Sequence, residues 1–224
     1  MSKNAEKWLD NNKFETPILI VDLAEIARSY QRINDAFPNI STLYAVKANP
    51  SKQIIKKLKD LGSGFDAASL SEIKLCLSLG IKAEKISFGN TIKKSKDIQK
   101  AYKLGIRLFV FDCEEELYKI SLYAPNSRVF CRIKVSNKGS EWPLSNKFGC
   151  ELAKIDYLIL KSIKLKLIPE GLSFHVGSQQ TMPNAWVQAL KLTEIIYEKL
   201  KIKGIYLDSL NIGGGFPIDY NKKY

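Results

Sequence analysis

The sequence predicts an α/β fold of repeated strand–helix units, arranged as an incomplete (β/α)8 TIM barrel. Short apolar runs begin at Leu43, Gly64, Ile86 and Leu108, and their spacing along the chain is nearly even. Each run is followed by a segment with the apolar periodicity of an amphipathic helix and with its own start and stop residues. Such regular alternation is typical of a parallel sheet with crossover helices.

Three further apolar runs, at residues 129–135, 168–176 and 205–212, bring the predicted core strands to seven. A closed barrel of this kind has eight units, and a seven-unit piece would leave two sheet edges exposed. We therefore expect a single domain over residues 1–224 that lacks its last unit and belongs to a longer polypeptide. An open, doubly wound sheet is the alternative, and an additional leading strand is predicted at residues 18–21.

Capping residues and glycines mark the expected helix boundaries. Ser69 with Glu72 forms a capping-box pattern, and Asp112 with Glu115 forms a similar pattern before a later helix. A polar segment at residues 136–147 is long for a strand–helix connection, so we expect it to be functional or mobile. The predicted helices span residues 23–37, 54–61, 70–79, 98–104, 155–164 and 186–200.

Composition limits the classes of protein that the chain can represent. It has 224 residues and a formal net charge of +12, yet its lysines are scattered and no arginine–aromatic stripe occurs. A solvated basic surface is therefore favoured over nucleic-acid binding. No secretory or membrane-spanning apolar segment is found, so we expect a cytoplasmic protein. Cys76, Cys113, Cys131 and Cys150 are far apart in the sequence, which argues against a metal site and a disulfide framework.

Lys47 lies where the first core strand, residues 43–46, runs out into a loop at Asn49 and Pro50. The carboxyl ends of barrel strands are where active sites are built. Apolar neighbours would remove part of the solvation of the ammonium group, disfavour its charged form and leave a nucleophilic amine suited to Schiff-base chemistry. The alternative is a lysine that simply extends from a strand end to water.

Other polar residues follow the remaining strands and would converge on the same rim of a barrel. His175, the only histidine, could stack on a flat ring or could be a satisfied core residue. Gly213, Gly214 and Gly215 follow the seventh strand, where barrels commonly bind phosphate, although three glycines can also mark only a sharp turn. The set at strand ends is Lys47, Asp66, Asn90, Asp112, Arg132, His175, Ser178, Gly213, Gly214 and Gly215.

The chemistry of these groups favours one cofactor. Arg132 in a buried strand should face an anion, because an unpaired buried guanidinium is costly. Asp66 could pair with Arg132 or with the lysine, or cap a helix, and Ser178 could donate to a phosphate oxygen. A single His without a Cys or carboxylate cluster argues against a metal. A Schiff-base lysine, a stacking imidazole and a phosphate nest together indicate pyridoxal 5′-phosphate.

Several motifs carry a resemblance to a known family. Those motifs resemble the fold-type III decarboxylases, which act on ornithine, lysine, arginine or diaminopimelate and have an alanine-racemase-like barrel. Residues 138–144 with 147–150 resemble the bacterial ornithine and lysine/ornithine enzymes, and the resemblance extends from Thr16 over nearly the whole chain. The motifs are residues 44–49 (YAVKAN), 65–69 (FDAAS), 173–178 (SFHVGS) and 211–217 (NIGGGFP).

The resemblance implies a role for each matching residue. Lys47 would bind the cofactor as a Schiff base and His175 would stack on its ring, which makes these two the expected catalytic residues. The implied reaction converts L-ornithine to putrescine, or L-lysine to cadaverine, in polyamine biosynthesis by a full-length homodimer. The implied cofactor-binding set is Lys47, Asp66, Arg132, His175, Ser178, Gly213, Gly214 and Gly215.

The sequence departs from the family after the glycine run. The family's acid for the pyridine nitrogen, its second phosphate-binding arginine and its C-terminal β-domain have no counterpart in these residues. We therefore expect the 224 residues alone to be inactive or nearly so. A diaminopimelate decarboxylase, and a truncated homologue that only binds the cofactor or a partner, are the alternatives.

Overall fold

The structure is a computed structural model that describes residues 2–145 and 147–219. Asn146 of the polar loop and residues 220–224 lie outside the described part of the chain. The chain divides into two compact units, Met1–Ile86 and Ser87–Tyr224, and each is described by itself. The single domain expected over all 224 residues stays a prediction.

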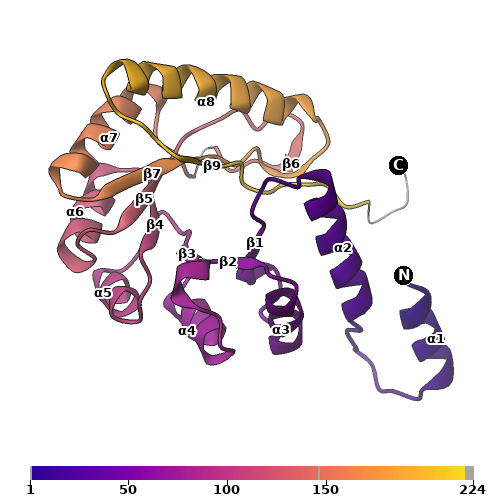
Figure 1. Ribbon diagram of the computed structural model, residues 1–224. Coiled ribbons are helices and arrows are strands. Elements are labelled where there is room, and N and C mark those ends of the chain that lie inside the picture. The colour runs from indigo at the N-terminus through magenta and orange to yellow at the C-terminus, as the bar shows by residue number, and fades with distance from the viewer. Residues whose placement is uncertain (1, 146, 220–224) are drawn as a thin grey trace. The chain divides into compact units, whose positions relative to one another are not determined.

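The first unit contains one pair of parallel strands with helices around it (Figure 1). Tyr44 and Phe65 are partners in the register of the two strands, and the Phe65 side chain is fully buried. The predicted capping box is confirmed, because Ser69 Oγ accepts from Glu72 N at 3.3 Å while Glu72 Oε2 accepts from Ala68 N at 2.7 Å. The elements are α1 (Lys3–Asn11), α2 (Leu23–Ala36), β1 (Leu43–Ala45), η1 (Val46–Ala48), α3 (Lys52–Asp60), β2 (Gly64–Ala67), α4 (Leu70–Ser78) and η2 (Ala83–Lys85).

Two expectations for this unit are wrong. Residues 18–21 form no strand, and Leu19 is 79% exposed, because none of the unit's described strands pairs with this segment. The first core strand is also one residue shorter than predicted, since Val46 belongs to the 3-10 turn η1. The helix predicted at residues 23–37 does form, as α2, although none of its residues is buried.

The second unit is built on parallel strands in the order β3-β4-β5-β7-β9, and β6 and β8 form a separate antiparallel pair. Helices α6 and α7 lie against strands β4, β5 and β7 (Figure 1). Buried aromatic and aliphatic residues such as Phe109, Phe111, Leu117 and Ile159 form the core. The elements are β3 (Ile86–Phe88), α5 (Ser95–Lys103), β4 (Leu108–Phe111), α6 (Glu114–Tyr123), β5 (Arg128–Arg132), β6 (Ser140–Trp142), η3 (Leu152–Lys154), α7 (Ile155–Lys164), β7 (Ile168–Ser173), β8 (Ser178–Gln180), α8 (Asn184–Ile202) and β9 (Ser209–Asn211).

The last three core strands are shorter than their apolar runs. β5 ends at Arg132, and the next residue, Ile133, forms an isolated bridge with Cys150. β7 ends at Ser173 and β9 at Asn211, where the backbone turns into the segments that carry the histidine and the glycines. Among the described residues, no helix combines the length and apolarity that crossing a bilayer requires.

A buried cluster of charges fixes the carboxyl ends of β3 and β4. Lys93 Nζ lies 2.8 Å from Glu116 Oε1 and donates to the carbonyl oxygens of Asn90 and Val110 at 2.7 and 2.6 Å. Glu116 Oε2 also pairs with Lys119 Nζ at 2.5 Å. Burial lowers the pKa of Lys93 to about 8, although Glu116 favours its charged form. The cluster therefore ties one helix to two strand ends.

Candidate active site

In the first unit, Lys47 lies in the turn η1 immediately after β1. Val46 before it is fully buried, whereas Lys47 itself is exposed. Tyr44 Oη donates to the carbonyl oxygen of Asn49 at 3.1 Å and so closes the turn around the lysine. The expected desolvation of the amine by apolar neighbours is therefore wrong, and the side chain is open to a ligand from solvent.

Asp66 lies on the strand next to the one that leads to Lys47. Its partner in the register is Ala45, two residues before the lysine, so Asp66 and Lys47 belong to the carboxyl ends of two paired strands. Asp66 is half-buried. Within this unit, two of the polar residues predicted at strand ends therefore lie on neighbouring strands.

In the second unit, three polar residues form one row across neighbouring strands. Ser173 of β7 is in register with Arg132 of β5 on one side and with Asn211 of β9 on the other. Residues in register on parallel strands share a face of the sheet. The Arg132 guanidinium lies 4.9 Å from the ring centre of Phe148, and Ser173 Oγ is buried with no hydrogen-bond partner among the residues that the structure describes. This row presents a cation and an unused hydroxyl at the end of the sheet.

His175 lies two residues beyond Ser173, and its ring orientation is set by a local hydrogen bond. Gly177 N donates to His175 Nδ1 at 3.0 Å, so the neutral imidazole carries its proton on Nε2. Asn137 Nδ2 donates to the carbonyl oxygen of His175 at 3.0 Å. The ring is half-buried, which suits a side chain that offers one flat face to a ligand.

The glycine run packs against residues 174–177, called here the histidine segment. Its three glycines differ in whether a side chain could be placed there. A β-carbon on Gly213 would lie 2.3 Å from the Phe174 carbonyl oxygen, and one on Gly215 would lie 2.1 Å from that of Gly177. Both glycines also have positive φ angles, +69° and +97°. Gly214 differs, because a β-carbon there would meet only His175 Nε2, at 3.8 Å.

The glycine run therefore serves both purposes that its sequence left open. Gly213 and Gly215 are needed for a sharp turn and a close backbone approach. Gly214 is not needed for either, and it leaves a free volume beside the imidazole. Asn211 Oδ1 accepts from Gly213 N at 2.8 Å and fixes the start of the turn.

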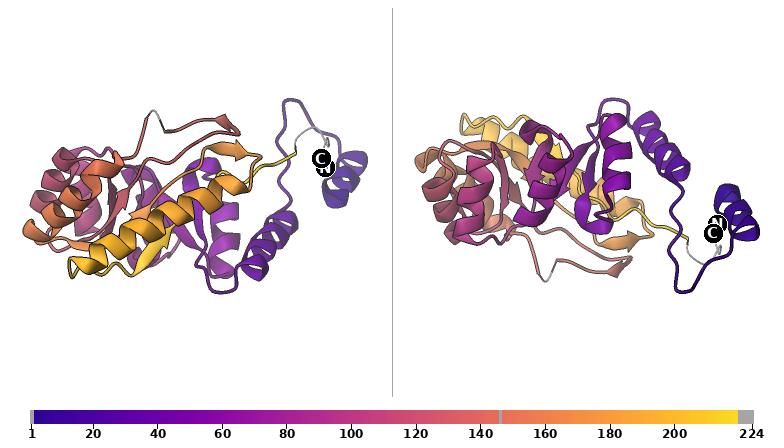
Figure 2. Two further views of the ribbon diagram at one scale, coloured as in Figure 1. Left: turned by 90° about the horizontal axis from the view of Figure 1, so that it is seen from above. Right: turned by 90° about the horizontal axis from the view of Figure 1, so that it is seen from below.

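Ser178 begins β8, directly after Gly177, and pairs in the register with Trp142 of β6. Gln180 N, at the other end of β8, donates to the carbonyl oxygen of Gly215 at 2.9 Å. These contacts bring Ser178, His175 and the glycine run together at one end of the second unit. Figure 2 shows from two sides how the loop that carries β6 reaches out from β5 to run beside β8.

The residues of the second unit fit the requirements of pyridoxal phosphate. A bare backbone at Gly214 can approach a dianion, an unused hydroxyl at Ser173 can donate, and a neutral imidazole can lie against an aromatic ring. Arg132 supplies positive charge on the same face as Ser173. In the first unit, the exposed Lys47 amine is a nucleophile of the kind that such a cofactor requires.

Two residues predicted at strand ends have structural partners instead. Asp112 follows β4 but does not cap α6, whose N-cap is Cys113, so the predicted cap is wrong. Its Oδ2 accepts from Gly149 N at 2.9 Å and holds the segment after the polar loop. Asn90 follows β3, and its Oδ1 accepts from Ile92 N at 3.2 Å.

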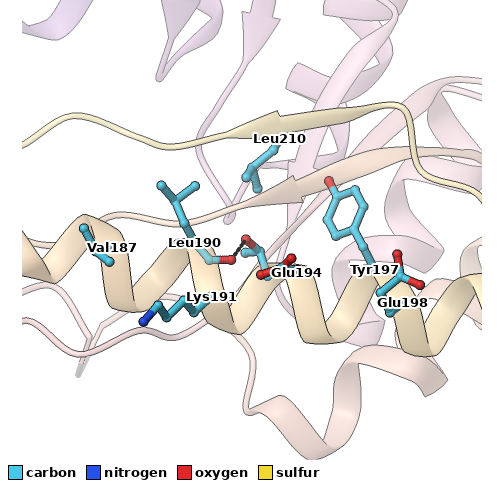
Figure 3. Close-up of a pocket in the computed structure, with 8 residues that line it drawn as sticks. Val187, Leu190, Lys191, Glu194, Tyr197, Glu198 and Leu210 are labelled. Atoms are coloured by element: carbon cyan, nitrogen blue, oxygen red, sulfur yellow. Dashed lines mark hydrogen bonds between the residues drawn. The ribbon is translucent and has the colours of Figure 1, made fainter.

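A pocket of about 480 Å³ lies along α8 and contains none of the predicted site residues (Figure 3). Tyr197 lines it, and its Oη donates to the Ser209 carbonyl oxygen at 2.5 Å and accepts from Leu172 N at 3.3 Å. Burial raises the pKa of Tyr197. The pocket is thus a feature of helix-to-sheet packing. Its lining residues are Val187, Leu190, Lys191, Thr193, Glu194, Tyr197, Glu198 and Leu210.

Sequence reasoning missed Asn137, Asn211 and Gln180, whose side chains hold the site's loops. Asn211 carried a signal, because Asn two residues before a glycine is typical of a side-chain-capped turn. Asn137 and Gln180 carried none, since their partners are distant in the sequence.

The chain is similar to known proteins in sequence and in fold. Residues 23–224 match the family model described as pyridoxal-dependent decarboxylase, pyridoxal binding domain. The chain is 38% identical to antizyme inhibitor 2 from Xenopus laevis and 35% identical to ornithine decarboxylase from Mus musculus. Each match spans 198 residues, which are 88% of this chain and 43% of the relative.

Solved structures of decarboxylases are also similar to this chain in fold. Lysine decarboxylase from Selenomonas ruminantium matches with a TM-score of 0.91 and 31% identity, over 99% of this chain and 58% of that chain. Lysine/ornithine decarboxylase from Vibrio vulnificus, complexed with putrescine, matches with a TM-score of 0.87 and 32% identity, over 97% and 57%.

The chain therefore belongs to the pyridoxal-binding domain family of the pyridoxal-dependent decarboxylases. This confirms the predicted family, its cofactor and the α/β barrel type of fold. The chain spans less than half the length of the curated relatives named above.

Proposed function

We propose that this chain supplies the cofactor-binding part of a decarboxylase that acts on a basic amino acid, L-ornithine or L-lysine. The observation that carries the proposal is the free volume at Gly214 beside His175 Nε2, next to two glycines that the turn itself requires. Further support comes from the relatives, since solved structures in this family are complexed with putrescine and with cadaverine. The products would be those diamines, as in polyamine biosynthesis.

Each residue has a task that follows from its surroundings. Lys47 offers an exposed amine to the aldehyde of the cofactor, and Asp66 on the paired strand can hold a proton near it. His175 offers a neutral ring face, while Gly214, Ser178 and Arg132 receive the phosphate and balance its charge. Bound pyridoxal phosphate would supply an electron sink for the electron pair left when the substrate loses CO₂.

Cofactor binding can be tested in the 224-residue chain by titration with pyridoxal phosphate. We expect a visible absorbance band that Lys47→Ala abolishes and Lys52→Ala, the same change at an exposed lysine of α3, leaves intact. A band of equal strength in Lys47→Ala would overturn the assignment of Lys47.

Substrate choice needs the longest natural form of the protein. We expect release of CO₂ from ornithine or lysine to exceed release from meso-diaminopimelate by at least about tenfold, the discrimination given by roughly 1.4 kcal/mol. The 224-residue chain alone should show almost none of this activity. A preference for diaminopimelate would assign the protein to that alternative branch.

We also propose that the full-length enzyme is a cytoplasmic homodimer. Size-exclusion chromatography with light scattering checks its oligomeric state.

A second candidate is a homologue without enzymatic activity that binds a protein partner. The match to antizyme inhibitor 2 from Xenopus laevis, at 38% identity, is the observation in its favour. Retention of Lys47, His175 and Gly214 counts against it, because a pure binding protein has no use for them. Full-length protein that binds pyridoxal phosphate but releases no CO₂ from any basic amino acid would favour this candidate.

A further inference from the structure

Asn137 joins the polar loop to the histidine segment through one buried side chain. It follows β5 and is only 8% exposed. Its Oδ1 accepts from the backbone amides of Leu144 and Ser145 at 2.6 and 2.7 Å, and its Nδ2 donates to the carbonyl oxygen of His175 at 3.0 Å. A single amide therefore uses its acceptor for the loop and its donor for the histidine.

A second buried amide side chain, that of Gln180 at the end of β8, holds the same loop. Gln180 is 1% exposed, and its Nε2 donates to the carbonyl oxygens of Lys138 and Val176 at 3.1 and 3.0 Å. Its backbone N–H is the donor to Gly215 described above. Two amide side chains thus join the loop to the histidine segment, and Asn137 is the one that reaches His175. The link to the glycine run is made by the backbone of Gln180.

The position requires an amide for a chemical reason. An aspartate would keep the acceptor for Leu144 and Ser145 but would place a carboxylate oxygen against the carbonyl oxygen of His175. An alanine would leave the two loop amides and the His175 carbonyl without their partner, and buried polar groups without partners are costly. The two variants therefore separate the donor role of Asn137 from its acceptor role.

We propose that Asn137 is a positioning residue for His175, holding the imidazole in the orientation in which Nε2 faces Gly214 and coupling that orientation to the order of the polar loop. Only the expected effect on cofactor affinity depends on the proposed function, and the orientation of the ring does not. The placement of the ring follows from the backbone of residues 175–177, since the Nδ1 partner is the N–H of Gly177. Loss of the hydrogen bond at the His175 carbonyl frees that backbone.

The single histidine makes the test direct, because ¹⁵N-histidine labelling gives one imidazole with no need for assignment. In the free wild-type chain we expect nitrogen shifts of the tautomer protonated at Nε2. In both Asn137→Asp and Asn137→Ala we expect these shifts to move toward the averaged values of a freely rotating ring. Asn39→Asp, the same change at an exposed site, should leave them unchanged.

The polar loop gives an independent readout. Lys138 and Lys147 are exposed, so trypsin can report how well the loop is held. We expect faster cleavage there in Asn137→Ala but not in Asn137→Asp, which keeps the acceptor. Affinity for pyridoxal phosphate should fall about tenfold in both variants, the loss expected for one well-placed hydrogen bond.

Unchanged imidazole shifts in folded Asn137→Asp would overturn the proposal, whether or not the wild type binds the cofactor. If the wild type binds no pyridoxal phosphate, the proposed function fails, but the spectra of the free protein still decide the role of Asn137. Circular dichroism identifies any variant that has not folded, and in that case Asn137→Ser, whose shorter side chain ends before the position of Nδ2 and so loses the bond to the His175 carbonyl, takes its place with the same expected shift.

Discussion

The carbonyl oxygen of Gly177 lies 2.1 Å from the place where a β-carbon on Gly215 would be. No side chain fits between these two segments, so the glycine run and the histidine segment can approach only as bare backbone. The contact brings the imidazole and the candidate phosphate nest together.

Substitution of individual glycines should separate folding from binding. Gly215→Ala should lower the free energy of unfolding by about 2 kcal/mol or more, because it adds both a clash and a strained positive φ. Gly214→Ala should change it by less than about 0.5 kcal/mol, since its methyl group would make only an ordinary van der Waals contact, with His175 Nε2 at 3.8 Å. Urea unfolding followed by tryptophan fluorescence measures both. Equal destabilisation by the two changes would contradict the distinct roles assigned to these glycines.

The buried charge cluster should depend strongly on Glu116. Glu116→Gln leaves Lys93 buried without a carboxylate, and we expect a loss of roughly 3 kcal/mol in the free energy of unfolding. The double change Lys93→Met with Glu116→Leu should recover most of this loss, because it removes both charges and fills similar volume. Lys119 can then turn toward solvent, since its side chain is already 30% exposed. A double variant no more stable than Glu116→Gln would contradict this account.

Lys93 also predicts a pH dependence of stability. Its pKa is lowered from 10.5 to about 8 in the folded protein, mainly by burial. Between these values the unfolded chain binds more protons than the folded chain, so raising the pH through this window should stabilise the fold. Other groups titrate in the same range, and the informative quantity is therefore the difference between wild type and the double variant at pH 7 to 10. A wild type that loses stability relative to the double variant as the pH rises would refute the lowered pKa of Lys93.

The cysteines should differ in reactivity toward a thiol reagent. The hydrogen bond between Cys131 and Cys150, whose sulfur atoms are 3.6 Å apart, and burial raise the pKa of Cys131, and burial raises that of Cys76 to about 11. Cys113 is half-buried and should react first. We expect one fast thiol in the folded protein, which is lost in Cys113→Ser and retained in Cys76→Ser. Several thiols of equal rate would show that the interior opens more readily than these contacts imply.

Much of the fold could be predicted because its signals are local. The starting residues predicted for β2, β3 and β4 are confirmed, since each one opens a short, largely apolar run. The helix predicted at residues 155–164 is confirmed as well, because its apolar residues recur at helical spacing. Lys47, His175 and the glycine run were identified because each directly follows such a run.

The errors concern residues whose partners are distant in the sequence. Asp112 has the pattern of a helix cap, but its carboxylate binds Gly149 N, 37 residues away. Cys131 and Cys150 are separated by 19 residues, yet their sulfur atoms meet. Asn137 is one asparagine in a polar loop until the His175 carbonyl is placed beside it. Propensity and periodicity carry no information about such pairs.

We propose that Lys47 and the glycine run bind opposite ends of one cofactor. The most direct measurement is borohydride trapping of pyridoxal phosphate followed by peptide mapping, in wild type and in Gly214→Ala. We predict that the label concentrates on Lys47 in the wild type and falls about tenfold in Gly214→Ala, while background labelling at Lys52 stays the same. Label spread evenly over the lysines, or equal labelling of Lys47 in both proteins, would contradict the claim.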